Sequence, residues 1–158
     1  MIDLPVQSLT NGSHIGTAGS IPGYSETRER VIQPKPRILV VEDIGTHRKL
    51  FRDLLRAYGF DVLELEDGVG LWEKIGDVRI DAALIDVFLP QISGITIVGM
   101  LRARWDAVTL PIIGVSAMPY ADTEQSVLAA GANAYFTKPV GLRDLAIRFA
   151  DLLGYRLP

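Results

Sequence analysis

Five chemically reactive side chains each come directly after a short apolar run, where a buried β-strand is expected to end. They are the acids Glu42, Asp43 and Asp86, the hydroxyl of Ser116 and the amine of Lys138. Three carboxylates that lie close together repel, at a cost of roughly 4 kcal/mol for two charges about 4 Å apart at an effective dielectric of about 20. Such a cluster either raises the pKa of an acid or recruits a cation.

The ligand types favour Mg²⁺ as that cation. Magnesium prefers oxygen ligands and is usually held by one or two carboxylates together with phosphate oxygens and water, whereas a site with neither cysteine nor an obvious histidine partner is a poor choice for zinc. With Mg²⁺ in place, one carboxylate becomes a candidate nucleophile toward phosphorus. Lys138 can then place its charge near one phosphoryl oxygen, and the Ser116 hydroxyl can donate to a second. The residue types predict phosphoryl transfer.

The elements that must position these side chains are five alternating strands and helices. Strands are expected over 38–41, 62–65, 82–85, 111–115 and 134–137, and amphipathic helices over 50–58, 71–75, 97–101, 123–130 and 142–153. This alternation predicts an α/β fold, a doubly wound five-stranded parallel sheet with five helices on its two faces. In such a sheet ligands bind at the carboxyl ends of the strands, where the strand order reverses.

Length and composition limit the remaining possibilities. A chain of 158 residues fits one compact domain. Residues 1–36 are rich in Gly, Ser, Thr and Pro without periodicity, which predicts a flexible N-terminal extension before a domain over 37–158. No apolar run reaches the roughly 18–20 residues that span a bilayer, and the lack of cysteine suits the cytoplasm. The net charge of −3 argues against direct nucleic-acid binding.

Residues 37–154 resemble the receiver domain of two-component response regulators, in the CheY-like superfamily. Four motifs carry the resemblance, in order: Ile38-Leu39-Val40-Val41-Glu42-Asp43; Leu84-Ile85-Asp86-Val87-Phe88-Leu89-Pro90 with Ser93-Gly94; Val115-Ser116-Ala117; and Gly131-Ala132 followed by Tyr135-Phe136-Thr137-Lys138-Pro139. The resemblance implies a CheY/flavodoxin-like fold. Because the chain stops after the fifth helix, it resembles the stand-alone receivers, and two further stretches lean toward the DivK-like, cell-cycle kind.

The resemblance also implies a role for each site residue. Asp86 is expected to be the phosphoacceptor, with Ser116 and Lys138 holding the phosphoryl group. The expected Mg²⁺ ligands are Asp43, Asp86 and the backbone carbonyl of Phe88, with Glu42 acting mainly through water. Tyr135 and Ser116 are expected to form the switch. The family leads us to expect self-phosphorylation from a phosphohistidine donor and slow autodephosphorylation, so the protein is not a conventional enzyme.

The implied partners are proteins. A sensor histidine kinase or a histidine phosphotransfer protein is expected as phosphodonor, docking over the first helix near Arg48, Phe51 and Arg52. A downstream protein target is expected to bind the surface of the fourth helix, fifth strand and fifth helix. Phe88 and Met118 stand where the family commonly has smaller or polar groups. We therefore expect them to hinder the hydrolytic water and lengthen the life of the phosphoaspartate.

Three other classes of function compete with this switch. A phosphorylation-independent interaction module would be expected to lack the acceptor or the lysine, and both are present. A phosphatase with an aspartyl nucleophile usually has a second acid two residues later, where this chain has Phe88. A nucleotide- or flavin-binding protein needs a glycine-rich loop that the turn after the first strand does not match. His14 and His47 have no partner at ligand spacing, so the sequence assigns them no role.

Overall fold

The computed structural model describes residues 34–118 and 121–158. The extension expected over 1–36 therefore lies outside the described residues, apart from its last three positions. Strands and helices alternate along the described chain as β1 (Arg37–Val41), α1 (Gly45–Ala57), β2 (Asp61–Leu65), α2 (Leu71–Ile75), β3 (Ala82–Asp86), α3 (Gly94–Arg102), β4 (Ile112–Ser116), α4 (Ala121–Ala129), β5 (Ala134–Thr137) and α5 (Leu142–Leu153).

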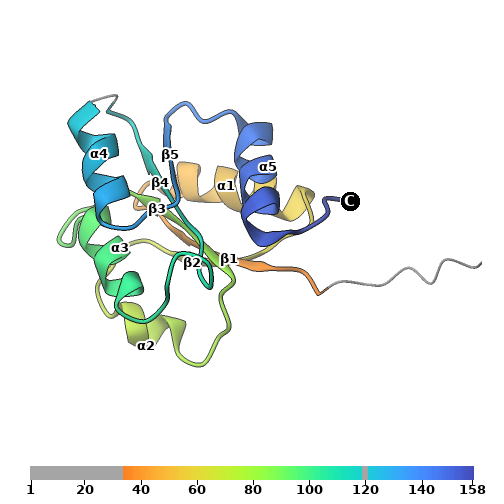
Figure 1. Ribbon diagram of the computed structural model, residues 1–158, viewed down its shortest axis with the longest axis horizontal. Helices are drawn as coiled ribbons and strands as arrows, with labels where there is room; N and C mark the ends of the chain where they lie inside the picture. The colour runs from red at the N-terminus through yellow and green to blue at the C-terminus, as the bar shows by residue number, and fades with distance from the viewer. Residues whose placement is uncertain (1–33, 119–120) are drawn as a thin grey trace, which may run out of the picture. The chain divides into compact units, whose positions relative to one another are not determined.

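The strands form one parallel sheet in the order β2-β1-β3-β4-β5 (Figure 1). The chain runs from β1 to β2 at one edge and then returns to place β3 on the other side of β1. The strand order thus reverses between β1 and β3, which confirms the predicted doubly wound, CheY/flavodoxin-like fold. This reversal defines where a ligand site is expected, at the carboxyl ends of β1 and β3.

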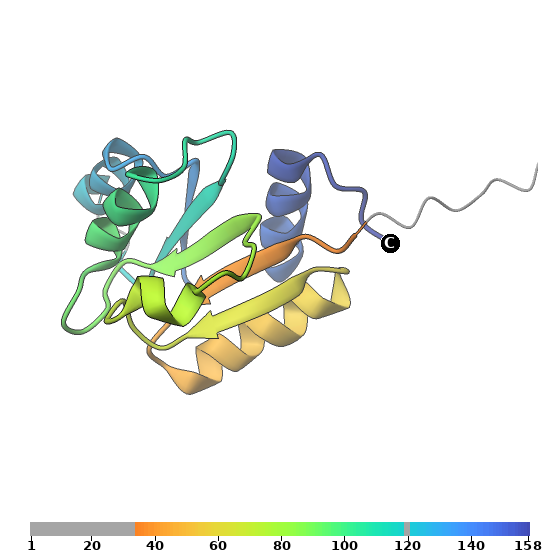
Figure 2. The ribbon, with the colours of Figure 1, turned by 90° about the horizontal axis from the view of Figure 1, so that it is seen from below.

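Helices cover both faces of the sheet, with α1 and α5 on one face and α2, α3 and α4 on the other (Figures 1 and 2). Alternate residues of β1 enter the two layers: Ile38 and Val40 pack with α1 and α5, whereas Leu39 and Val41 pack with α2 and α3. Because both faces are buried, the inner strands are continuous apolar runs rather than alternating ones. The core therefore holds the strand ends in place.

Local signals set the helix boundaries. The buried Phe51 and Leu55 lie one turn apart on α1, and the chain leaves that helix through Gly59 at a φ of 87°, a conformation that costs glycine little. The Ser93 hydroxyl accepts a hydrogen bond from the Thr96 N–H at 3.2 Å and caps α3. Within residues 34–118 and 121–158, no helix is long and apolar enough to cross a membrane.

Candidate functional site

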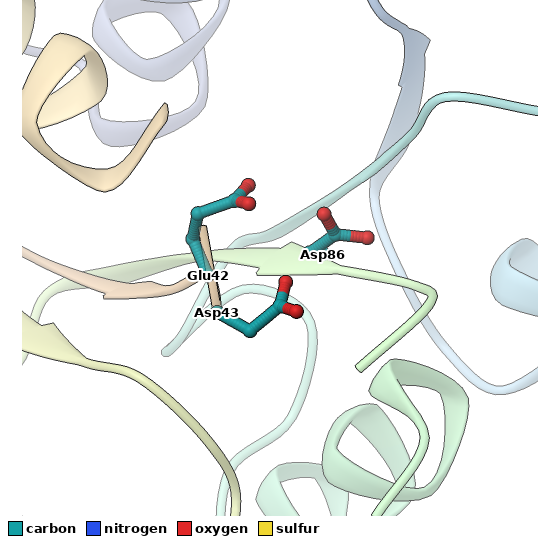
Figure 3. Close-up of side chains that lie close together, drawn as sticks. All are labelled: Glu42, Asp43 and Asp86. Carbon is teal, nitrogen blue, oxygen red and sulfur yellow. The ribbon is translucent and has the colours of Figure 1, made fainter. Parts of the chain in front are cut away.

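Three carboxylates meet at the carboxyl ends of β1 and β3 (Figure 3). Glu42 and Asp43 follow β1, Asp86 is the last residue of β3, and one oxygen of each lies within 4.8 Å of the others. Glu42 is 1% exposed and Asp86 is 5% exposed, while Asp43 is open to solvent. The cluster therefore has two buried acids and one acid at its mouth.

Lys138 supplies the balancing charge from the end of β5. Its Nζ donates to Asp86 Oδ2 at 2.5 Å and to Glu42 Oε2 at 2.7 Å. Burial alone would lower the pKa of Lys138, but the hydrogen bonds to the two carboxylates outweigh burial and raise it. The ammonium is therefore charged and bridges the two buried acids.

One ammonium does not fully compensate the acids. The pKa of Glu42 is raised above its ordinary value of 4.5, first because burial removes water from the carboxylate, while the Lys138 hydrogen bond acts in the opposite direction and the nearby Asp86 charge adds to the rise. The ionised form of Glu42 is therefore held at a cost to the fold. A bound cation would therefore stabilise the ionised carboxylates of this site.

A Glu42→Gln substitution is expected to stabilise the metal-free protein at neutral pH by about 1–2 kcal/mol, because it removes a like-charge contact from a partly solvated site. A raised folded-state pKa contributes stability that is present below pH 4.5 and lost as pH rises through the folded value. The gain should thus vanish below pH 4.5 and be complete at neutral pH. Urea unfolding across this range, with the exposed Glu66→Gln as control, measures it; an unchanged or lowered stability at neutral pH contradicts it.

The turn after β3 holds the Asp86 carboxylate in a fixed orientation. The Phe88 N–H donates to Asp86 Oδ1 at 2.9 Å, and the Gly94 N–H donates to the Val87 carbonyl at 2.9 Å. A Cβ added to Gly94 would lie 1.9 Å from the Asp86 carbonyl oxygen. Glycine at the start of α3 therefore lets the helix approach the backbone of Asp86. Neither composition nor periodicity indicates this requirement.

Ser116 and Tyr135 are linked through the peptide groups of Met118. The buried Ser116 hydroxyl accepts from the Met118 N–H at 3.0 Å, and the Tyr135 hydroxyl donates to the Met118 carbonyl at 3.0 Å. The Ser116 oxygen is occupied as an acceptor but keeps its own proton for donation. Next to it, the Lys138 N–H donates to the Ser116 carbonyl at 2.7 Å. Ser116, Tyr135 and Lys138 are therefore connected by hydrogen bonds to or within the chain segment 116–118.

Two residues of α1 reach the acidic cluster in ways that sequence reasoning missed. His47, to which the sequence assigned no role, has its Nδ1 3.3 Å from Lys138 Nζ and 3.4 Å from Glu42 Oε1. Arg48, expected only as part of a docking surface, donates to the backbone carbonyls of Glu42 and Asp43 at 2.5 and 3.3 Å. The His47 contact joins residues 91 positions apart, which no sequence pattern indicates, whereas the Arg48 contacts reach back only five and six residues, across the turn between β1 and α1.

The donor set is compatible with magnesium. All three acids offer oxygen, the atom type that Mg²⁺ prefers, and the exposed position of Asp43 leaves room for the water ligands that Mg²⁺ usually retains. Among the described residues, Glu42, Asp43 and Asp86 are the acids that could hold such an ion. The candidate site is thus an acidic, partly solvated pocket with a lysine at one side.

Comparisons with known proteins agree on one family. The family model of the response regulator receiver domain matches residues 38–150. The chain is 30% identical over 117 residues to the polar-differentiation response regulator DivK of Brucella anthropi. The matched region covers 74% of this chain and 95% of that protein. The receiver domain of a Francisella response regulator superposes with a TM-score of 0.68 at 27% identity, covering 76% of this chain and 98% of that one.

A further structural relative bears on the metal. The receiver domain of a sensor histidine kinase from Pseudomonas aeruginosa has a magnesium ion coordinated in its active-site cleft. It superposes with a TM-score of 0.68 at 28% identity, covering 77% of this chain and 99% of that one. The ion belongs to that protein.

The fold and the acidic cluster together define a CheY-like protein of two-component signalling. The chain belongs to the response regulator receiver domain family, and DivK is among the proteins similar to it. The predicted family is confirmed, and the phosphatase and nucleotide-binding alternatives lose their support.

Proposed function

We propose that this response regulator is a cytoplasmic phosphorylation switch in which Asp86 accepts a phosphoryl group in a Mg²⁺-dependent reaction. The observation that carries the proposal is the Lys138 ammonium, which contacts both Asp86 and Glu42 beside the exposed carboxylate of Asp43. An acceptor carboxylate, a lysine cation and a set of metal ligands are the parts that phosphoryl transfer requires.

The side chains have separate tasks in the reaction. A carboxylate oxygen of Asp86 attacks phosphorus while the P–N bond of the donor phosphohistidine breaks and its electron pair stays on the imidazole. The Phe88 N–H holds the other carboxylate oxygen. The Lys138 ammonium leaves Asp86 and donates a hydrogen bond to one phosphoryl oxygen, and the Ser116 hydroxyl donates a hydrogen bond to another. Asp43, Asp86 and the backbone carbonyl of Phe88 would hold Mg²⁺, with Glu42 acting through water, and the bound ion would neutralise negative charge on the phosphoryl group.

The phosphodonor, a histidine kinase or histidine phosphotransfer protein, is expected to bind along α1. An apolar groove of about 480 Å³ lies between α1 and the segment that joins β5 to α5. It is lined by His47, Leu50, Phe51, Ala117, Lys138, Pro139, Val140 and Leu142. Leu50 is 48% exposed, and Lys138 lies at the same groove. An amphipathic donor helix in this groove would bring its histidine near Asp86.

The output is expected to be binding of a downstream protein. A Ser116 side chain that turns toward a phosphoryl group gives up its bond from the Met118 N–H, and Met118 also accepts from Tyr135. Phosphorylation would thereby change the position of Tyr135 and the surface of α4, β5 and α5. This is a two-state response, in which the partner binds one state more tightly.

A Phe88→Asn variant is expected to lose its phosphoryl group about threefold to tenfold faster than the parent, because an amide can hold the hydrolytic water that the phenyl ring excludes. Phe88 is 54% exposed and Met118 is 46% exposed beside the site. Following the phosphorylated species by intact-mass spectrometry gives the rate. Val108→Asn replaces an apolar residue that is 88% exposed on the α3–β4 loop and should leave it unchanged. Equal rates in Phe88→Asn and the parent would refute the hypothesis.

The proposal is tested by intact-mass spectrometry after incubation with acetyl phosphate. One added phosphoryl group is expected with Mg²⁺, and none with EDTA or in an Asp86→Asn variant. Beryllofluoride, which mimics a phosphoryl group on a carboxylate, covers the case of an adduct too short-lived to detect. If the protein neither gains mass nor binds beryllofluoride, the phosphorylation-independent module is the better description.

A further inference from the structure

His47 lies at the acidic cluster although it is neither an acid nor an expected metal ligand. It belongs to the first turn of α1, its side chain is 41% exposed, and its Nδ1 is 3.3 Å from Lys138 Nζ. At this position the imidazole also lines the apolar groove beside the site. Its ring therefore touches both the lysine and the surface on which the phosphodonor is expected to bind.

The Lys138 ammonium has one acceptor for each of its protons. An ammonium group carries three N–H donors and no acceptor. Among the described residues, its acceptors are Asp86 Oδ2 at 2.5 Å, Glu42 Oε2 at 2.7 Å and His47 Nδ1 at 3.3 Å. The third contact is the longest of the three, and its acceptor is an imidazole nitrogen rather than a carboxylate oxygen. His47 is not among the expected metal ligands, which distinguishes it from the two carboxylates.

The geometry also selects a tautomer of His47. A proton on Nδ1 would face the donor protons of the Lys138 ammonium across 3.3 Å, which is unfavourable. Glu42 Oε1 lies 3.4 Å from Nδ1, but this pair forms no hydrogen bond, whereas Lys138 Nζ and His47 Nδ1 do. The lone pair of Nδ1 therefore points at Lys138, and the ring proton lies on Nε2.

We propose that His47 is a positioning residue that keeps Lys138 within reach of the phosphoryl group. This role rests on the proposed function of Asp86. When Asp86 is phosphorylated, its carboxylate no longer accepts the same bond, and Glu42 would share its negative charge with a bound Mg²⁺ as well as with Lys138. Two of the three anchors of the ammonium thus change, while His47 stays. The imidazole nitrogen can therefore hold the lysine in place while its other protons are donated to the phosphoryl oxygen.

The tautomer is tested in the metal-free protein by ¹⁵N NMR of the imidazoles at mildly alkaline pH. The chain has 2 histidines, so the signals lost in His47→Asn assign His47. The expected result is an unprotonated Nδ1, a protonated Nε2, and an Nδ1 signal that shifts in Lys138→Met. A protonated Nδ1, or no response to Lys138→Met, would overturn the contact on which the proposal is built.

The positioning role is tested by the affinity for beryllofluoride in the presence of Mg²⁺. In asparagine, as in histidine, an acceptor atom is bonded to Cγ, so His47→Asn preserves the contact with Lys138; glutamine places its acceptor one carbon further, and leucine has none. We expect His47→Leu and His47→Gln to bind about threefold to tenfold more weakly than the parent, and His47→Asn to bind nearly as tightly. Thermal unfolding of each variant separates this from loss of the fold.

The outcomes distinguish the two proposals. If the parent binds beryllofluoride and His47→Leu binds equally well, the role of His47 is refuted while the switch stands. Equal weakening in the leucine and asparagine variants would also refute it, since the loss would then follow from the ring rather than from its acceptor. If the parent itself fails to bind, the proposed function of Asp86 falls, and the role of His47 falls with it.

Discussion

A Gly94→Ala variant is expected to be destabilised by about 1–3 kcal/mol, the usual cost of inserting a methyl group into a packed backbone contact. The added Cβ would lie 1.9 Å from the Asp86 carbonyl oxygen and 2.7 Å from Val87 Cα, both of which are backbone atoms. No rotamer change can relieve such a contact. Either the start of α3 or the end of β3 must therefore move.

The displacement should also reach the chemistry, since Asp86 carries the acceptor carboxylate on the same residue. A shift of about 1 Å in a reacting group can slow a reaction by about 100-fold, so phosphorylation by acetyl phosphate is expected to be about 10- to 100-fold slower. Urea unfolding and time-resolved intact-mass spectrometry measure the two effects separately. A variant as stable and as reactive as the parent would show that the close approach of α3 is not required.

Gly99→Ala is the matched control in the same helix. A Cβ at Gly99 meets nothing within 4 Å, and the residue is exposed in the interior of α3. Alanine is favoured over glycine there by about 0.5–1 kcal/mol, so this variant should be slightly more stable than the parent and equally reactive. Opposite signs for the same substitution on one helix would assign the effect of Gly94 to its contact with Asp86.

A Lys138→Met variant is expected to lose roughly 1–3 kcal/mol of stability at neutral pH when no metal is present. Removing one partner of a buried ion pair leaves an uncompensated charge, at a cost of about 3–5 kcal/mol for full burial; the solvated Asp43 side of the site reduces this figure. Lys138 is 12% exposed, Glu42 is 1% exposed and Asp86 is 7% exposed as side chains. The loss thus falls on two buried acids.

The pH and metal dependence identify the cause. Without the Lys138 hydrogen bond, which lowers the pKa of Glu42, that already raised pKa should rise further. A raised acid pKa contributes stability at low pH that is lost as pH rises through it, so the deficit should be largest at neutral pH and should shrink toward pH 4.5. Mg²⁺ should stabilise the variant more than the parent, because the ammonium no longer competes for the same carboxylates.

Lys49→Met is the control for loss of a lysine charge. Lys49 is 67% exposed and pairs with Asp53 one turn away on α1, and exposed pairs of this kind contribute about 0.3–0.5 kcal/mol. Thermal unfolding of both variants over a pH series, with and without Mg²⁺, makes the comparison. A pH-independent deficit in Lys138→Met would indicate lost packing rather than unbalanced charge.

The order and type of the elements follow from short-range patterns in the chain. The apolar runs at 38–41 and 82–85 predict strands buried on both faces, and the structure extends these to Arg37–Val41 and Ala82–Asp86. Helical spacing of apolar residues predicts α1 and α5. On α1 this spacing begins at Leu50, whereas the helix itself begins at Gly45, where no side chain caps it. Such patterns are local because they reflect which face of each element is buried.

The acids, the hydroxyl and the amine could likewise be chosen because they stand at the ends of predicted strands, whereas the expected roles of Tyr135 and Phe88 came from the family resemblance. That the tips share one edge follows from the parallel sheet, but the contacts among them do not follow from the pattern. Lys138 and Asp86 are 52 residues apart in the chain, and they meet because only one strand, β4, lies between β3 and β5 in the sheet. Packing also decides which acid is buried, because Glu42 is buried whereas its neighbour Asp43 is exposed.

His47 and Gly94 mark the limit of the sequence pattern. The imidazole of His47 meets Lys138 91 residues away, and Gly94 meets the backbone of Asp86 rather than a side chain that periodicity could reveal. Residue types and their order were therefore sufficient to predict the fold and to select the acids, the hydroxyl and the amine that the structure brings to one edge of the sheet. The contacts of His47 and Gly94 were decided by how α1 and α3 pack against the sheet. Contacts between different elements depend on that packing and not on the spacing of residues along a single helix or strand.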